Sequence, residues 1–273
     1  MLTAVVLHLR PVAAVRLPVS HGSFAHASAM DLLVRLDPLL SHLLHHTAER
    51  KPFTCSPLGG ATRREGFNFL LDPEQLYTWR LTGLTAAVSQ QLVRLSPQLG
   101  GIRIGEAVFS VVDVSTAPEQ HPEAGQDTYE ALLARWTRPT PQPCSTVTLH
   151  FLTPTTFRMG GLEQPFPLPH WVFGSLLATW NAFSAYPLPD LRESLDEAVV
   201  LSNYRAETRR VELGGHRTVG FVGKCTYRVV KPAPELCQLL GLLAAFSFYA
   251  GVGWQTTHGL GQVRPQFPSL RSA

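Results

Sequence analysis

The chain alternates between two patterns of apolar residues, one with a period of two and one with a period of three to four. The first pattern is typical of half-buried strands and the second of amphipathic helices. On this basis we expect strands or hairpins at 3–9, 51–58, 67–72, 76–84, 102–116, 145–161, 199–211, 216–230 and 262–264. Helices are expected at 27–46, 85–95, 127–136, 169–183 and 234–249, with a possible kink at Pro38.

Strands and helices thus alternate in both halves, and long antiparallel hairpins connect several of the strands. This order favours an α+β protein of two tandem ferredoxin-like (RRM-like, βαββαβ) domains over a parallel doubly wound sheet. The proline-rich segment 138–143 separates the halves. We therefore expect an N-terminal domain at 1–140 and a C-terminal domain at 141–273, inferred from the pattern since the halves share no visible sequence repeat.

Composition supports a globular protein with a large core. Apolar residues make up 45 % of the 273 residues and charged residues 16 %. The four cysteines, at 55, 144, 225 and 237, occur singly. That spacing indicates neither a zinc knuckle nor a disulfide framework, so reduced thiols and a cytoplasmic location are expected.

Two apolar stretches resemble membrane or export signals but are interpreted otherwise. The first residues, 1–12, are interrupted by His8 and Arg10 and predict a strand and not a signal peptide. The uncharged stretch 236–254 would supply only ~21 Å of helix against a hydrocarbon core of ~30 Å. A buried core helix is therefore expected, and no membrane partner.

Positive charge is concentrated in the hairpin expected at 199–230. The whole chain carries a net charge of +3, whereas 203–231 holds seven basic and two acidic residues, 7 − 2 = +5. Such a charge excess is often only a solvated face. Beside a flexible glycine loop it favours a surface that follows a phosphodiester backbone.

That glycine loop is "FYAGVGWQTTHGLGQVRP", residues 248–265. It matches neither a dinucleotide-binding fingerprint, because Thr256 stands where the third glycine belongs, nor a Walker A loop. A helix precedes it and a strand follows, so the negative end of the helix dipole is near the loop and an anion would need loop amides and basic side chains. A glycine-rich turn that lets the last strand pack tightly is an equally good interpretation.

Several segments together resemble a known family. They are "GVGWQTTHGLGQVRP" after an apolar helix, "FVGKCTYRV", "LTPTTFRMGG" followed by "PLPHWVFGSLLATWNAF", and "LLHHTAERKPFTCSPL". The chain resembles the CRISPR-associated endoribonucleases that cut repeat RNA into guide units, the sixth Cas protein family within the RAMP superfamily. Residues 60–140 carry least of the resemblance.

The resemblance implies a metal-independent cleavage in which the RNA 2′-hydroxyl attacks the adjacent phosphate, leaving a 2′,3′-cyclic phosphate and a 5′-hydroxyl. It implies His45 as the catalytic histidine and Lys51 as the catalytic lysine, with no cofactor. A histidine has the pKa for proton transfer near neutral pH, and a lysine can stabilise the phosphorane. His42 and His46 share a helical face with His45 and stay alternatives. A zinc site on His42 and His46 lacks a third ligand nearby.

A tyrosine found near the start of the same helix in some family members corresponds to Met30 here, which cannot titrate. His26, Ser23 or Ser28 are possible substitutes. Without the resemblance, the histidine cluster would be read as exposed residues on an amphipathic helix.

For binding, the resemblance implies that the basic hairpin and the glycine loop hold the repeat RNA. The expected contacts are Arg158, Arg205, Arg209, Arg210, Arg217, Lys224, Gly251, Gly253, Trp254, His258, Gly259 and Gly261. Trp254 would stack on a base, with core packing as the alternative. The expected partner is precursor CRISPR repeat RNA, with effector-complex subunits as further candidates and a monomer or homodimer left open. A non-catalytic RNA-binding RAMP subunit and a small-molecule-binding ferredoxin-like protein are the rival functions.

Overall fold

The computed structural model describes the whole chain except residues 41, 43–49, 139–143, 232 and 269–273. The chain divides into two compact units. Unit 1 comprises 1–127, 212–216 and 257–259, and unit 2 comprises 128–211, 217–256 and 260–273.

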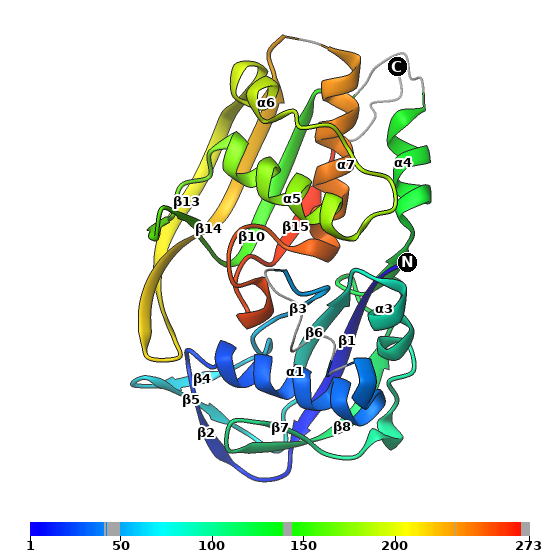
Figure 1. Cartoon of the computed structure of the whole chain (residues 1–273). Helices are drawn as coiled ribbons and strands as arrows, with labels where there is room; N and C mark the ends of the chain where they lie inside the picture. Colours follow the sequence, from blue (N-terminus) through cyan, green and yellow to red (C-terminus); the bar gives the residue numbers. More distant parts are fainter. Residues whose placement is uncertain (41, 43–49, 139–143, 232, 269–273) are drawn as a thin grey trace. The chain divides into compact units, whose positions relative to one another are not determined.

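Residues 1–127 form mainly strands, which α1 (Gly22–Leu36) and α3 (Ala86–Leu92) accompany together with a short helical segment after Pro38 (Figure 1). The strands are β1 (Leu2–Pro11), β2 (Val15–Pro18), β3 (Phe53–Cys55), β4 (Arg63–Glu65), β5 (Asn68–Leu71), β6 (Tyr77–Gly83), β7 (Ile102–Ile104), β8 (Ala107–Ser115) and β9 (Gly125–Asp127). The helices are α1 (Gly22–Leu36), α3 (Ala86–Leu92) and the 3₁₀ turn η1 (Pro97–Leu99).

The main sheet of unit 1 has the strand order β3-β6-β1-β8-β7, with β9 also paired to β1, and β2-β5-β4 form a separate small sheet. The sequence β1, α1, β3, β6, α3, β8 is a βαββαβ unit whose first strand lies between its third and fourth. This is the ferredoxin-like topology. The expected fold of the first half is therefore confirmed.

One face of this sheet is buried beneath α1 and α3. Leu7 and Leu9 of β1 are fully buried with Ala29 and Leu33 of α1 and Val88 of α3. Small residues on α1 bring the helix close to the strands, and leucines fill the space between them. This packing fixes α1 against β3 at one edge of the sheet and β7 at the other.

From residue 128 onward the chain forms a second sheet with its own helices (Figure 1). The strands are β10 (Thr146–Thr155), β11 (Phe157–Met159), β12 (Leu162–Gln164), β13 (Val199–Leu213), β14 (His216–Val229) and β15 (Val263–Gln266). The helices are α4 (Tyr129–Thr137), α5 (Pro169–Phe183), α6 (Arg192–Ala198), α7 (Pro234–Ala250) and the 3₁₀ turn η2 (Thr256–His258).

The sheet of unit 2 has the order β13-β14-β10-β15, so β10, α5, β13, β14, α7 and β15 repeat the ferredoxin-like topology. Its core contains an aromatic cluster in which Trp180 lies 4.9 Å from Tyr129 and 5.1 Å from Phe246, measured between ring centroids. The Trp180 indole N–H donates to the carbonyl of Tyr186 at 2.7 Å, which satisfies the buried polar atom. An α+β fold of two ferredoxin-like units is thus confirmed.

The first long helix ends earlier than the sequence pattern predicts. The pattern favours 27–46 with a kink, but α1 runs from Gly22 to Leu36 and Asp37 is extended, with φ −156° and ψ 95°. Pro38 disfavours the helical conformation of the residue before it, so the helix stops there. Asp37 Oδ1 then accepts a hydrogen bond from the Leu40 amide at 3.0 Å and caps a new helical turn.

The expected core helix at 234–249 is α7, which begins with Pro234 in its first turn and buries residues around much of its circumference. In the described parts of the chain, no helix is both long and apolar enough to cross a bilayer.

Candidate functional site

Of the predicted catalytic pair, His45 and Lys51, only Lys51 belongs to the described residues. Lys51 lies two residues before β3 and is half-buried. His45 and its alternative His46 lie outside the described residues, whereas the other alternative, His42, is exposed in the helical segment that follows Pro38.

His26 of α1 places its imidazole next to β3. Its ring stacks on Phe53 of β3 with centroids 5.8 Å apart and on His258 with centroids 4.0 Å apart. His258 belongs to the glycine loop and is the third member of this stack. Gly22 permits the approach, because a Cβ there would lie only 2.0 Å from the carbonyl oxygen of His258.

Hydrogen bonds to Thr257 hold the stack in place. The carbonyl of Thr257 accepts from His26 Nδ1 at 3.1 Å and from the Cys55 thiol at 2.8 Å. The Thr257 hydroxyl and His258 Nδ1 are 3.0 Å apart. Because a carbonyl can only accept, His26 carries its proton on Nδ1 in this arrangement.

Burial decides the ionisation of this cluster. Burial, followed by the nearby charge of His26, lowers the pKa of His258 to about 4. Burial raises the pKa of Cys55 to about 12. At neutral pH His258 is therefore a neutral ring and Cys55 a neutral thiol, so neither supplies a cation or a reactive thiolate.

A fully buried histidine fixes the start of α1. His21 Nε2 accepts from the Leu58 amide at 2.8 Å, and Nδ1 then donates to the Pro18 carbonyl at 2.9 Å. Burial lowers its pKa. His21 thus joins three segments around the site as a neutral ring, a role that the sequence pattern did not predict.

The proposed substitutes for the missing family tyrosine differ in their surroundings. Met30 itself is buried in the core. Ser28 is buried as well, and its hydroxyl donates to the Phe24 carbonyl at 2.8 Å on the side of α1 that contacts β7. His26 is the half-exposed residue beside β3, and so it is better placed than Ser28 to assist near Lys51.

The sheet of unit 2 carries a row of basic side chains. His150 of β10 pairs with Lys224 of β14 on one side and with Arg264 of β15 on the other. Alternation along β10 buries Val147 and Leu149 and leaves His150 half-exposed. Burial, followed by the charges of Lys224 and Arg264, lowers the pKa of His150.

Neighbouring strands are ~4.8 Å apart, so this row matches the reach of one or two phosphates. Of its members, only Lys224 was expected from the sequence. His150 could have been found from the polar positions of the strict alternation at 146–151, whereas Arg264 lies in the last strand and joins the row only through the strand pairing.

The other predicted cations of the β13–β14 hairpin are all exposed. These are Arg205, Arg209, Arg210 and Arg217. Arg209 pairs with Glu207 two residues away, and both side chains are more than half exposed. An exposed pair of this kind is worth little and leaves the guanidinium free to exchange its partner for a phosphate.

Several amides of the glycine loop donate hydrogen bonds within unit 2. The pairs are Gly251 to Ser247 O (3.0 Å), Val252 to Gly261 O (2.8 Å), Gly253 to Ser175 Oγ (3.2 Å), Trp254 to Thr156 O (2.9 Å) and Gly261 to Pro154 O (3.0 Å). These five donors are thus already satisfied, which supports the packing interpretation of the loop. RNA contact at Gly251, Gly253, Gly259 and Gly261 stays a prediction.

Trp254 is neither fully packed into the core nor fully exposed, and its stacking on a base stays a prediction. It is half-buried, and the guanidinium of Arg158 lies 5.2 Å from its ring centroid. A cation over the ring face is attracted by the ring quadrupole. The two predicted RNA contacts, Arg158 and Trp254, are therefore neighbours within unit 2.

Among the described residues, no group of three or more histidine, cysteine, aspartate or glutamate side chains is placed to hold a metal ion.

Known proteins that are similar to this chain include CRISPR-associated endoribonucleases. Residues 149–263 match the family model "CRISPR-associated endoribonuclease Cas6". The Cas6 of Mycobacterium tuberculosis is 26% identical over 192 residues, 69% of this chain, and the chain spans 58% of the length of that relative.

Solved structures match over nearly the whole chain. The product complex of Cas6 (TTHB231), a protein of Thermus thermophilus, has 31% identity and a TM-score of 0.79, covering 97% of this chain and all of that one. A substrate-mimic complex of a second Cas6 (TTHA0078) has 29% identity and a TM-score of 0.72, covering 97% of this chain and 99% of that one.

Proposed function

Since the chain belongs to the family of CRISPR-associated endoribonucleases Cas6, we propose that it cleaves CRISPR repeat RNA in the precursor transcript to give guide RNAs. The observation that carries the proposal is the 31% identity, over 97% of this chain, to a Cas6 solved as a product complex. The basic row Lys224–His150–Arg264 supports RNA as the ligand.

The proposed reaction uses the RNA itself as nucleophile. A base removes the proton of the 2′-hydroxyl, the 2′-oxygen attacks the adjacent phosphorus, and the bond to the 5′-oxygen of the next nucleotide breaks. An acid returns a proton to that 5′-oxygen, so the products are a 2′,3′-cyclic phosphate and a 5′-hydroxyl. Because the nucleophile is internal, the reaction needs no metal-activated water.

We assign proton transfer to His45 and charge stabilisation to Lys51. Lys51 stands at the entrance to β3, whose Phe53 packs against the stacked imidazole of His26. A cation at this point would stabilise the additional negative charge of the phosphorane. His26 assists from α1 in the place of the family tyrosine.

Binding is assigned to the exposed surface of unit 2. The proposed phosphate contacts are Arg158, Arg205, Arg209, Arg210, Arg217 and Lys224, with His150 and Arg264 added from the structure. Trp254 offers a ring for a base, since one base stacked on an aromatic side chain contributes ~1–3 kcal/mol. His258 would act as a neutral hydrogen-bonding partner.

Cleavage of the cognate repeat RNA in EDTA tests the proposal. The wild-type protein should cut once per repeat and leave a cyclic phosphate, and a single 2′-deoxy nucleotide upstream of the cut should block cleavage without weakening binding. His45→Ala should slow cleavage by about 10²–10⁴-fold, the usual contribution of a general acid or base. His216→Ala, at an exposed site in β14, is the matched control and should cut normally.

The outcomes separate the rival functions. A protein that binds the repeat but never cuts it would be a non-catalytic RAMP subunit. Normal cutting by His45→Ala with loss in His42→Ala or His46→Ala would move the catalytic assignment to that neighbouring histidine. Cutting of the 2′-deoxy substrate would point to water as the nucleophile.

A further inference from the structure

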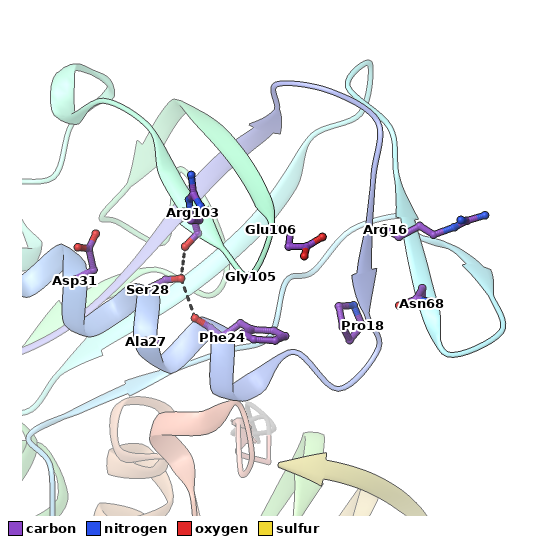
Figure 2. Close-up of a pocket in the computed structure, with 10 residues that line it drawn as sticks. All are labelled: Arg16, Pro18, Phe24, Ala27, Ser28, Asp31, Asn68, Arg103, Gly105 and Glu106. Carbon is purple, nitrogen blue, oxygen red and sulfur yellow. Dashed lines mark hydrogen bonds between the residues drawn. The ribbon is translucent and has the colours of Figure 1, made fainter. Parts of the chain in front are cut away.

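A cavity of about 850 Å³ in unit 1 has no role in the reaction described above (Figure 2). It lies between the first half of α1, the β7–β8 turn and the small sheet of β2 and β5. Its lining includes Arg16, Phe24, Asn68, Arg103 and Glu106. Its volume is within the range of ~300–1,000 Å³ usual for ligand pockets.

The walls of this cavity are tied together. Ser28 is buried, and its hydroxyl contacts the carbonyls of Phe24 and Arg103, which joins α1 to β7 (Figure 2). Gly105, with φ +62°, makes the turn, and a Cβ there would lie 3.3 Å from the Phe24 ring. The turn that carries Arg103 and Glu106 is therefore held against the helix before any ligand binds.

Two of the four charged side chains that line the cavity are neutralised by neighbours. Arg16 pairs with Glu65 at 2.9 Å, and Asp31 pairs with Arg35 at 3.3 Å.

Arg103, Glu106 and the ring of Phe24 can contact a ligand in the cavity. Within the described parts of the chain, the Arg103 guanidinium and the Glu106 carboxylate form no hydrogen bond or ion pair. The Phe24 side chain is 44% exposed and its ring lies at the base of the opening between Glu106 and Pro18 (Figure 2). The site thus offers one cation, one carboxylate and one aromatic face.

We propose that this cavity binds one unpaired nucleotide of the RNA substrate, an inference that rests on the proposed function. The base stacks on Phe24, its hydrogen-bonding edge faces Glu106, and a phosphate contacts Arg103 at the rim. Guanine fits best, because its N1–H and N2–H can both donate to one carboxylate, and Asn68 on the opposite wall supplies an amide.

The position of the cavity agrees with this ligand. Phe24, Ala27 and Ser28 line it from one flank of α1, whereas His26 faces β3 from the other. An α-helix with its side chains is ~10–12 Å across. An RNA strand that reaches Lys51 would therefore need only a few nucleotides to cross α1 and enter the cavity.

Binding of the repeat RNA, measured by fluorescence anisotropy, tests the inference. Each unpaired nucleotide is replaced in turn by an abasic site, and the dissociation constant is measured for wild type and Phe24→Ala. An abasic site at one position should weaken binding to wild type by roughly fivefold to a hundredfold, as expected for a lost base–aromatic stack. The same abasic site should weaken binding to Phe24→Ala by less than about twofold. Phe67→Ala, which removes an 86% exposed ring outside the cavity, should respond as wild type does.

The base edge is tested at that same position. Inosine in place of guanosine removes the N2 amino group and should weaken binding by about five- to tenfold in wild type but not in Glu106→Gln. Glu119→Gln, on an exposed loop after β8, is the control. Arg103→Ala should lower the affinity in a salt-dependent manner, with Arg94→Ala as its control.

The two proposals fail separately. Wild-type protein that cuts the repeat, with no nucleotide coupled to Phe24, would overturn the pocket and leave the nuclease intact. A coupled position that is insensitive to inosine, or is not a guanine, would overturn the assignment of the base edge to Glu106. Wild-type protein that neither binds nor cuts the repeat would remove both proposals.

Discussion

The stack of His26 and His258 makes the stability of the protein depend on pH. The pKa of His258 is lowered from 6.5 to about 4 in the folded chain, first by burial and then by His26. Above pH 6.5 the ring is neutral in both states and contributes no difference. Below pH 6.5 the unfolded chain takes up a proton that the folded chain does not, so stability falls until the pH reaches about 4.

The size of this effect follows from the shift. At pH 4.5, a pKa of about 4 against 6.5 corresponds to ~2.5 kcal/mol of lost unfolding free energy. His258 is only half-buried, and solvent screening reduces this to about 1–1.5 kcal/mol. For a chain of this size that loss lowers the Tm by about 2–5 °C.

Thermal unfolding of wild type and His258→Asn between pH 7.5 and 4.5 measures how much stability the titration of His258 removes. Asparagine keeps a polar atom near the Thr257 hydroxyl, with which His258 Nδ1 interacts, but does not titrate. The variant should lose stability on acidification less steeply than wild type, by about 1 kcal/mol. His216→Asn controls for the loss of a histidine at an exposed site. Parallel pH profiles for wild type and His258→Asn would refute a depressed pKa at His258.

Two further predictions concern packing and RNA affinity. Gly22→Ala should destabilise the protein by about 1–3 kcal/mol in denaturant unfolding, because its Cβ would meet the His258 carbonyl at 2.0 Å. Gly174→Ala in the middle of α5, where the nearest atom is an Arg192 carbon at 3.6 Å, should instead stabilise by up to ~1 kcal/mol; a similar loss in both would contradict the packing. Lys224→Ala should reduce the slope of log K against log salt for repeat RNA by about 1, and an unchanged slope would exclude a phosphate at Lys224.

The sequence pattern was most informative where local spacing and burial agree. The alternation at 146–151 predicted β10, and the uncharged run with Pro234 at its start predicted α7. Over 27–46 the pattern predicted one helix with a kink at Pro38, whereas α1 ends at Leu36 and a separate helical turn follows Pro38. Here the backbone constraint on Asp37 outweighs the periodicity of the side chains.

The short elements were also missed. β2, β4, β9 and α6 have three to seven residues each. Segments of this length show too few periods to be distinguished from loops, and they form because neighbouring strands and helices supply their partners.

For the candidate site too, some features could be predicted from the sequence and others could not. The sequence by itself determined the order of strands and helices, from which two ferredoxin-like units were predicted, and the concentration of positive charge at 203–231. The glycine loop and the "KPFT" segment gave a resemblance to the family, and the similarity to a solved Cas6 then showed that the chain belongs to it. The element order and the charge depend on residues close together along the chain, so they can be read before folding.

Only the tertiary structure decided which side chains meet. His26 and Thr257 are 231 positions apart, yet they share a hydrogen bond beside β3. His150 joins Lys224 and Arg264 through the register of three strands, and Phe24 and Glu106 both line the cavity of unit 1. Sequence spacing sets the period of each element, but strand register and the close approach allowed by Gly22 and Gly105 set these contacts, because they depend on residues far along the chain.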